Sequence, residues 1–271
     1  MSINSIEEKL KEIEAWFEKK CSKVIIAFSG GVDSCLVAYL ARKCLGKENA
    51  TAIIADSPSL KRKDLEVAIS FCKAYDINLE IVNTQEFENP NYTSNPVDRC
   101  YFCKFTLYDE LKLIAEKYPG TDILNGQNFD DLGDYRPGIK AAKEYKVLKP
   151  LADCNFTKID IREMAKHFEL STWDKPASPC LSSRIPYGQE VTIAKLQQVE
   201  AAENMLNSLG FEEVRVRHFG KIAKIEVPAN QLERLKKYHK DIEHNILDLG
   251  FEKCEFDQEG LVSGKLNRAL A

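Results

Sequence analysis

The sequence predicts an α/β fold: a doubly wound parallel sheet with a second, smaller α+β domain at its C-terminal end. Short apolar runs rich in β-branched residues alternate with amphipathic segments through residue 169, as in a parallel sheet covered by helices. A glycine-rich turn follows the first of these runs. After a proline-containing stretch, two strands that meet at a glycine mark the second domain.

The first domain is expected to span residues 1–175. Its helices are predicted over 4–20, 35–41, 59–75, 103–118 and 157–169, and its strands over 23–28, 51–55, 79–83, 122–126 and 146–148. The first helix carries Ile6, Leu10, Ile13 and Phe17 on one stripe, which is typical of a helix that packs on a core. Ligands of such sheets bind beyond the carboxyl ends of the strands, so the turns that follow strands are the candidate site.

Residues 176–191 are expected to form a linker loop, because they contain Pro176, Pro179, Pro186 and Gly188. Residues 192–271 are then predicted to form a small α+β domain for substrate binding or oligomerisation. Its helices are expected over 192–209 and 230–248, and its strands over 214–217, 223–227 and 251–256.

Composition and charge limit the function classes. The 271 residues are 44% hydrophobic and 30% charged, and no apolar run approaches the ~20 residues of a membrane span. The N-terminal segment has no apolar core of a secretory signal, so we expect a cytoplasmic protein without a membrane partner. The net charge of −4 argues against binding nucleic acid mainly through its phosphates, which usually requires a basic excess.

The nine cysteines, an odd number in a chain without an export signal, do not predict a disulfide framework. Six of them fall in or beside predicted helices and strands and are expected to be small buried hydrophobic residues: Cys21, Cys35, Cys44, Cys72, Cys154 and Cys254. The other three, Cys100, Cys103 and Cys180, lie in unusual contexts.

The stretch Ser29-Gly30-Gly31-Val32-Asp33-Ser34 joins the first strand to a helix. Its two glycines let the backbone turn sharply and approach a ligand. Asp33 and Ser34 fall near the helix start, where unpaired N–H groups and the helix dipole favour an anion. The stretch lacks the lysine of a Walker A loop and the glycine spacing of a dinucleotide fingerprint. It therefore predicts a phosphate site of another kind.

Asp130, Asp131 and Asp134 follow the fourth predicted strand. Carboxylates at the carboxyl end of a strand suit Mg²⁺ that is carried by nucleotide phosphates. An acidic turn that caps a helix opening near Pro137 would explain the same residues. Both interpretations can hold for different aspartates.

Cys100 and Cys103 form a C-x-x-C pair just before a predicted helix. A thioredoxin-like redox pair usually lies in its own small fold, and a structural zinc site needs about four ligands, for which no second pair exists. Two ligands of an iron–sulfur cluster and two unrelated thiols remain as alternatives.

Cys180 lies in the proline-containing loop, close to Arg184. A nucleophile, a metal ligand and a linker thiol without a role are all consistent with this position. Arg215 and Arg217 alternate with valines on a predicted strand, so they share one face. Paired guanidiniums suit a phosphate or a carboxylate, and a solvated strand face is the alternative.

Residues Ser29–Ser34 resemble, position by position, the phosphate loop of the PP-loop ATP pyrophosphatase superfamily. With Arg99–Lys104, Asp130–Gly138 and Ala177–Gly188, the chain resembles the LarE family over almost its whole length. Ala177–Gly188 is the most specific stretch, because the phosphate loop is shared across the superfamily. The resemblance implies an adenine nucleotide α hydrolase-like fold and cleavage of ATP between its α and β phosphates.

LarE proteins are ATP-dependent sulfur transferases. The resemblance implies that the carboxylates of pyridinium-3,5-biscarboxylate mononucleotide are adenylated and become thiocarboxylates, for the nickel-pincer nucleotide of lactate racemase. ATP and Mg²⁺ are the implied cofactors. The implied partners are this nucleotide substrate, a sulfide or cysteine desulfurase as sulfur source, and further copies of the chain in a homo-oligomer.

The resemblance leaves two routes for sulfur. In members with three cysteines at the positions of Cys100, Cys103 and Cys180, these residues hold a [4Fe–4S] cluster whose open iron can carry a sulfide. In sacrificial members, the cysteine at the Cys180 position donates its own sulfur and becomes dehydroalanine. We expect the cluster form here, because all three cysteines are present.

The expected site follows from these motifs. Cys180, Asp33 and Arg184 are the expected catalytic residues, and Mg²⁺ is expected near Asp33 and Asp131. ATP is expected on Ser29, Gly30, Gly31, Asp33 and Ser34, with Ala55, Asp56 and Gly126 along its adenine and ribose. Arg184, Arg215 and Arg217 are expected to hold the phosphate or the remaining carboxylate of the substrate.

Three other functions are alternatives to this one. A cluster-dependent tRNA thiolase would use the same adenylation on a base, but the charge of −4 and the lack of an RNA-binding module argue against it. An amidotransferase-type synthetase would need a glutaminase module, and none is visible. An ATP-sensing protein with a redox-active cluster is the non-enzymatic alternative.

Overall fold

The computed structural model describes residues 3–133, 137–262 and 265. Contacts between residues divide the chain into two compact units. The first contains Met1–Glu86 and Asp98–Ser178, and the second contains Phe87–Val97 and Pro179–Ala271. Among the described helices, none is long and apolar enough to cross a membrane.

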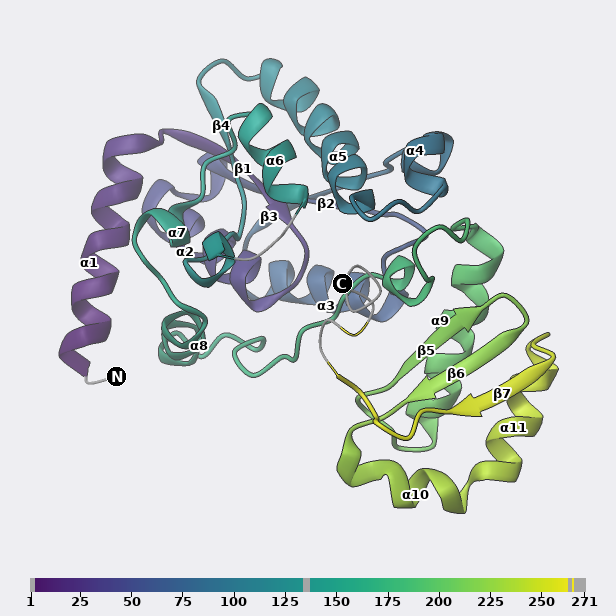
Figure 1. The fold of residues 1–271 in the computed structure, drawn as a ribbon. Helices are drawn as coiled ribbons and strands as arrows, with labels where there is room; N and C mark the ends of the chain where they lie inside the picture. The colour runs from purple at the N-terminus through teal and green to yellow at the C-terminus, as the bar shows by residue number, and fades with distance from the viewer. Residues whose placement is uncertain (1–2, 134–136, 263–264, 266–271) are drawn as a thin grey trace. The chain divides into compact units, whose positions relative to one another are not determined.

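A four-stranded parallel sheet forms the centre of the first unit, as the sequence predicts (Figure 1). Its strands are β1 (Lys23–Phe28), β2 (Ala50–Ala55), β3 (Asn78–Val82) and β4 (Thr121–Leu124), in the order β3-β2-β1-β4. The order reverses between β1 and β4, and the turns at the carboxyl ends of these two strands therefore flank the crevice where such sheets bind ligands.

The predicted fifth strand over 146–148 is wrong. Only a single bridge, between Leu124 and Leu148, joins this stretch to the sheet. Lys146 has a φ of 52°, in the left-handed region, so the backbone there is not extended.

Helices cover both faces of the sheet, because alternate residues of each strand point to opposite sides. Val24, Ile26 and Phe28 of β1 belong to a core with α1 (Ile3–Lys20), α2 (Val32–Leu45), α3 (Arg62–Ala74), α7 (Pro150–Asp153) and α8 (Lys158–His167). Ile25 and Ala27 belong to a second core with α5 (Arg99–Glu116) and α6 (Pro137–Glu144). This two-sided packing confirms the doubly wound arrangement.

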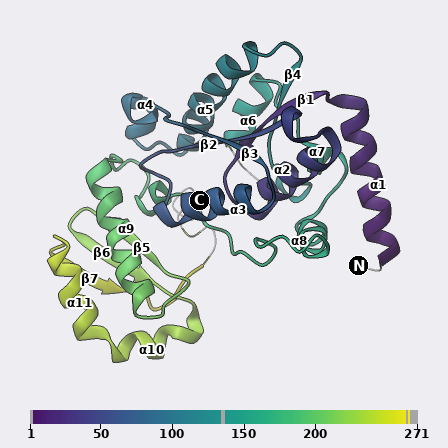
Figure 2. The ribbon, with the colours of Figure 1, turned by 180° about the vertical axis from the view of Figure 1, so that it is seen from behind.

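The second unit contains a three-stranded sheet of β5 (Arg215–Phe219), β6 (Ile222–Glu226) and β7 (Lys253–Phe256). β5 and β6 pair antiparallel, and β6 and β7 pair parallel. α9 (Ile193–Ser208) lies along this sheet in Figure 2 and shares its hydrophobic core with α11 (His239–Asp248). The helix predicted over 230–248 is divided into α10 (Leu232–Lys237) and α11, because Tyr238 leaves helical backbone angles.

Residues 87–97 pack with the loop that carries Cys180. This segment contains α4 (Pro90–Thr93) and ends near Asn95, which is fully buried. The Asn95 side-chain amide donates to the carbonyls of Ile185, Pro186 and Gln189 at 3.2, 2.7 and 3.0 Å. The Tyr92 hydroxyl lies 2.7 Å from Ser182 Oγ. The loop after Cys180 is thus held by buried polar groups.

Candidate functional site

The turn between β1 and α2 has the geometry of a phosphate site. Gly31 is the N-cap residue of α2 and no side chain caps it, so the first N–H groups of the helix are available for an anion. Ser34 Oγ accepts from Ser29 N at 3.2 Å and donates to Gly31 O at 3.1 Å, which closes the turn. Gly30 has a φ of +68°, a conformation that glycine adopts without strain.

Gly126, two residues after the end of β4, lies directly against this turn. A Cβ at position 126 would lie 2.8 Å from Ser34 N and 3.1 Å from the Asp33 carbonyl carbon. Only glycine leaves room over the first turn of α2, on which phosphates are expected. The structure thus brings Gly126 and Ser34 together from distant parts of the chain.

Asp33 forms an ion pair that the sequence did not predict. Lys158, the first residue of α8, donates to Asp33 Oδ1 at 2.7 Å and to Oδ2 at 2.6 Å. Asn128 Nδ2 donates to Asp33 Oδ1 at 3.2 Å. Both groups fix the orientation of the Asp33 carboxylate at the start of α2. No motif marked Lys158, because a single lysine at a helix start carries no spacing signal.

The acidic turn after β4 serves partly as a cap. Asp130 Oδ2 accepts from Lys158 N at 2.8 Å, at the start of α8 and not at the helix near Pro137. Asp131 is 8% exposed, and its Oδ2 accepts from Asn128 N at 3.2 Å. Asp131 is therefore linked to Asp33 through Asn128, and its role toward Mg²⁺ stays a prediction. Asp134 lies outside the described residues.

Ala55 and Asp56 lie at the end of β2, on the same carboxyl edge of the sheet as the phosphate turn. Asp56 N donates to Val82 O at 2.7 Å, and its carboxylate forms an ion pair with Arg62. The next residue, Ser57, donates to Glu86, a carboxylate that is 1% exposed. This loop is therefore rigidly held where adenosine is expected.

The cysteines fall into two classes. Burial raises the pKa of five of them, Cys21, Cys35, Cys72, Cys154 and Cys254, to about 12, and that of Cys44 to about 11. Such thiols are poor nucleophiles and poor ligands at neutral pH. Cys100 and Cys180 are exposed, and Cys103 is partly exposed. The three cysteines that the sequence singled out are therefore accessible, whereas only Cys44 of the other six is partly exposed.

The C-x-x-C pair lies inside a helix and not before it, which corrects the predicted boundary. α5 begins at Arg99, so Cys100 and Cys103 are three residues apart on its first turns and share a face. Two thiolates so placed fit two ligands of a cluster. Within the described residues, no three His, Cys, Asp or Glu side chains form a metal-binding group.

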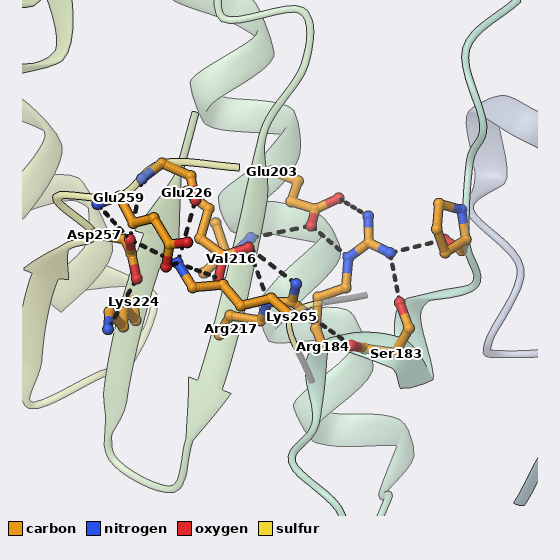
Figure 3. Close-up of polar contacts among 12 residues, drawn as sticks. Ser183, Arg184, Glu203, Val216, Arg217, Lys224, Glu226, Asp257, Glu259 and Lys265 are labelled. Atoms are coloured by element: carbon orange, nitrogen blue, oxygen red, sulfur yellow. Dashed lines mark hydrogen bonds and ion pairs between the residues drawn. The ribbon is translucent and has the colours of Figure 1, made fainter. Parts of the chain in front are cut away.

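Arg184 and Arg217, which the sequence predicts to hold the substrate, have acidic partners within the second unit. Arg184 is 1% exposed, and its guanidinium donates to both oxygens of Glu203 at 2.8 and 3.1 Å (Figure 3). It also donates to the carbonyls of Pro179 and Cys180 at 2.8 and 3.2 Å. Arg184 therefore holds the backbone of the Cys180 loop in place.

Arg217 is 4% exposed and pairs with Glu226 at 3.0 Å. Its Nη1 donates to Ser183 O at 2.7 Å, so it supports the same loop (Figure 3). In the described part of the second unit, no acidic side chain forms an ion pair with Arg215. Burial lowers the pKa of Arg215, and the charges of Arg184 and Arg217 lower it further. Arg215 is thus the arginine of the three whose charge remains for an anion.

The chain is similar to known proteins over most of its length. Residues 2–94, which include the phosphate turn, match the NAD synthase family. An uncharacterized protein of Synechocystis is 45% identical over 98% of this chain and 99% of its own. The pyridinium-3,5-bisthiocarboxylic acid mononucleotide synthase of Lactiplantibacillus plantarum is 34% identical over 93% of this chain and 91% of its own. The chain belongs to the LarE family.

This membership confirms the resemblance of the sequence to LarE proteins. An uncharacterized protein from Methanocaldococcus jannaschii is 30% identical over 92% of this chain and 91% of its own. The similarity to the L. plantarum synthase covers both compact units, so the LarE family accounts for the second unit as well as for the phosphate turn.

Proposed function

We propose that this protein is an ATP-dependent sulfurtransferase that converts the carboxylates of pyridinium-3,5-biscarboxylate mononucleotide into thiocarboxylates. The observation that carries the proposal is the phosphate turn with Asp33 and Lys158 at its helix, in a chain related over nearly its full length to a synthase of the bisthiocarboxylate product. The product would serve nickel-pincer nucleotide synthesis.

The first step is adenylation. A carboxylate oxygen of the substrate attacks the α-phosphorus of ATP, the bond from this phosphorus to the bridging oxygen breaks, and pyrophosphate leaves. The N–H groups of the first turn of α2 bind the phosphates, and Asp33 would hold the Mg²⁺ that offsets their charge. Lys158 adds a cation beside Asp33, where charge develops on the leaving group. Catalysis is mainly positioning and charge neutralisation.

The second step is sulfur transfer. A sulfur nucleophile attacks the acyl carbon of the adenylate, the carbon–oxygen bond breaks, and AMP leaves. Cys180 is exposed, and Arg184 and Asn95 hold the loop on which it lies. With Cys100 and Cys103 it would bind a [4Fe–4S] cluster, which would supply inorganic sulfur. Without a cluster, the Cys180 thiolate itself would attack the acyl carbon and form a thioester. Loss of the Cα proton of Cys180 and cleavage of its Cβ–S bond would then leave the sulfur on the product as a thiocarboxylate and dehydroalanine at position 180.

Arg215 is the residue we assign to the phosphate or the second carboxylate of the substrate. Its guanidinium is half-buried, so an anion that binds it gains a charge-assisted hydrogen bond in a partly dry environment. Arg184 and Arg217 contribute positive charge nearby while remaining paired. We further propose that a sulfide or a cysteine desulfurase renews the sulfur, and that the protein forms homo-oligomers.

The test uses protein expressed and purified without oxygen. We expect pyrophosphate release that depends on the biscarboxylate nucleotide, about four irons per chain, and more than one thiocarboxylate per chain when sulfide is supplied. Absence of substrate-dependent pyrophosphate would overturn the function. Iron-free protein that makes at most one thiocarboxylate per chain and loses the Cys180 sulfur would exclude the cluster. Cys100→Ala, which should lose repeated turnover, is compared with Cys44→Ala.

A further inference from the structure

One carboxylate in the first unit binds two residues that lie just before Cys180 in the sequence. Asp64, in the first turn of α3, accepts from Lys175 Nζ at 3.0 Å on Oδ1 and from Ser178 Oγ at 2.6 Å on Oδ2. Asp64 is 14% exposed, so the ion pair with Lys175 is largely shielded from water. Both oxygens of one side chain thus hold the segment that leads into Cys180.

Lys175 also reaches the phosphate turn. Its Nζ donates to the carbonyl oxygen of Gly30 at 3.0 Å. In a trans peptide, the carbonyl of one residue and the N–H of the next point in opposite directions. Holding the Gly30 carbonyl therefore fixes the direction of the Gly31 N–H, a donor of the turn that binds phosphate. Lys175 acts on the turn from behind, on the side of the carbonyl.

α3 supports the turn directly as well. A Cβ added to Gly30 would lie 3.0 Å from the Ala68 side chain and 3.5 Å from the Asp64 carbonyl oxygen. The turn therefore rests on the same helix that carries Asp64. A change in the turn when phosphates bind has a direct mechanical path, through Lys175 and Asp64, to Ser178.

We propose that Asp64 is a positioning residue that couples the phosphate turn to the segment leading into Cys180, by holding Lys175 on Gly30 and Ser178 on its other carboxylate oxygen. The inference rests on the ATP site of the proposed function and adds a residue that no sequence motif marked. It predicts that nucleotide binding orders the segment before Cys180, so that sulfur transfer follows adenylation.

The test measures hydrogen–deuterium exchange by mass spectrometry on the purified protein, with and without Mg²⁺ and the non-hydrolysable analogue α,β-methylene-ATP. In the wild type, the analogue should slow exchange both at residues 29–34 and at residues 177–183. Asp64→Asn should lose the protection of 177–183 and bind the analogue about tenfold more weakly, the usual effect of losing a hydrogen bond to a charged group.

Three further variants separate the two arms of the contact. Ser178→Ala should keep the protection of the phosphate turn and lose that of 177–183, and Ser178→Thr, which keeps the hydroxyl, should restore it. Lys175→Met should weaken analogue binding about as much as Asp64→Asn. Glu66→Gln, an exposed carboxylate on the same helix, is the matched control and should behave as the wild type.

The inference is overturned if Asp64→Asn melts at the wild-type temperature yet binds the analogue and protects 177–183 as the wild type does. If Asp64→Asn does not fold, Ser178→Ala decides the question instead. The inference is overturned if the analogue protects residues 177–183 of Ser178→Ala as strongly as in the wild type. These measurements use no carboxylate substrate. Coupled protection without substrate-dependent pyrophosphate would therefore contradict the proposed function and leave the coupling intact.

Discussion

Lys158 donates to both carboxylate oxygens of Asp33, at 2.6 and 2.7 Å, although 125 residues separate them in the chain. A carboxylate beside a phosphate turn must avoid repelling an incoming nucleotide, and Lys158 neutralises it. A magnesium ion that binds Asp33 would compete with this contact. Lys158 would then be released toward the phosphates, where a positive charge stabilises the leaving pyrophosphate.

Replacing Lys158 with methionine keeps most of the side-chain length and removes the charge. Pyrophosphate release should fall by about 100-fold, as when other groups that stabilise a developing charge are removed. Mn²⁺ without nucleotide should bind more tightly, because Asp33 loses its competing partner. Electron paramagnetic resonance of free Mn²⁺ measures the binding. Lys166→Met, exposed on the same helix, is the control, and unchanged Mn²⁺ affinity in Lys158→Met would contradict the competition.

The buried pair of Arg184 and Glu203 should determine the stability of the second unit. Arg184→Met removes the cation that pairs with the Glu203 carboxylate, which is 2% exposed, so the free energy of unfolding in urea should fall by about 3–5 kcal/mol. The double variant Arg184→Met with Glu203→Met should lose less unfolding free energy than the two single variants lose together. Lys253→Met removes an exposed pair with Glu255 and should cost about 1 kcal/mol at most. An equal loss of unfolding free energy in Arg184→Met and in Lys253→Met would refute the structural role of Arg184.

Local patterns were sufficient for the parallel sheet and for the phosphate turn. The run from Lys23 to Phe28 is apolar on both faces, because helices cover the sheet on both sides. Residues Ser29–Ser34 lie next to each other in the sequence, so their spacing alone marks the turn. The strand predicted at 146–148 failed because the left-handed backbone of Lys146 depends on its local turn and not on residue hydrophobicity.

Partnerships across the chain could not be predicted. Asp33 meets Lys158, and Arg217 meets Glu226 on the neighbouring strand, only once the fold is formed. The alternation in β5 predicts that Arg215 and Arg217 share a face of the strand. It does not predict that Arg217 pairs with a buried glutamate while Arg215 forms no ion pair within the described residues. Sequence patterns therefore find charged residues near a site more readily than they assign their roles.

Asp257 should make the second unit sensitive to acid. Burial alone would raise the pKa of Asp257, but ion pairs with Lys265 and Lys224 at 2.7 and 2.9 Å lower it from 3.8 to about 2. Because the pKa of Asp257 is lower in the folded protein than in the unfolded chain, the ionised carboxylate stabilises the fold at pH values above the unfolded pKa. This stability, about 2 kcal/mol, disappears as pH falls from 4 toward 2.

Urea unfolding at several pH values tests this contribution. Asp257→Asn should be less stable than the wild type at neutral pH, and the difference should shrink below pH 4. Asp248→Asn, an exposed side chain near the end of α11, should show no such trend. A difference between Asp257→Asn and the wild type that stays constant from neutral pH to pH 2 would contradict the assigned ion pairs.

Gly126→Ala tests whether the space above α2 is a phosphate site. The added methyl group would lie 2.8 Å from Ser34 N, on backbone that cannot move away without opening the turn. ATP should bind at least about tenfold more weakly, because the methyl occupies the volume over the donors and shifts them. Gly133→Ala is the matched control, because a Cβ added at Gly133 would meet no described residue within 4 Å. If calorimetry gave the wild-type ATP affinity for a folded Gly126→Ala, the phosphates would have to bind elsewhere. That result would also contradict the proposed roles of Asp33 and Lys158 in adenylation.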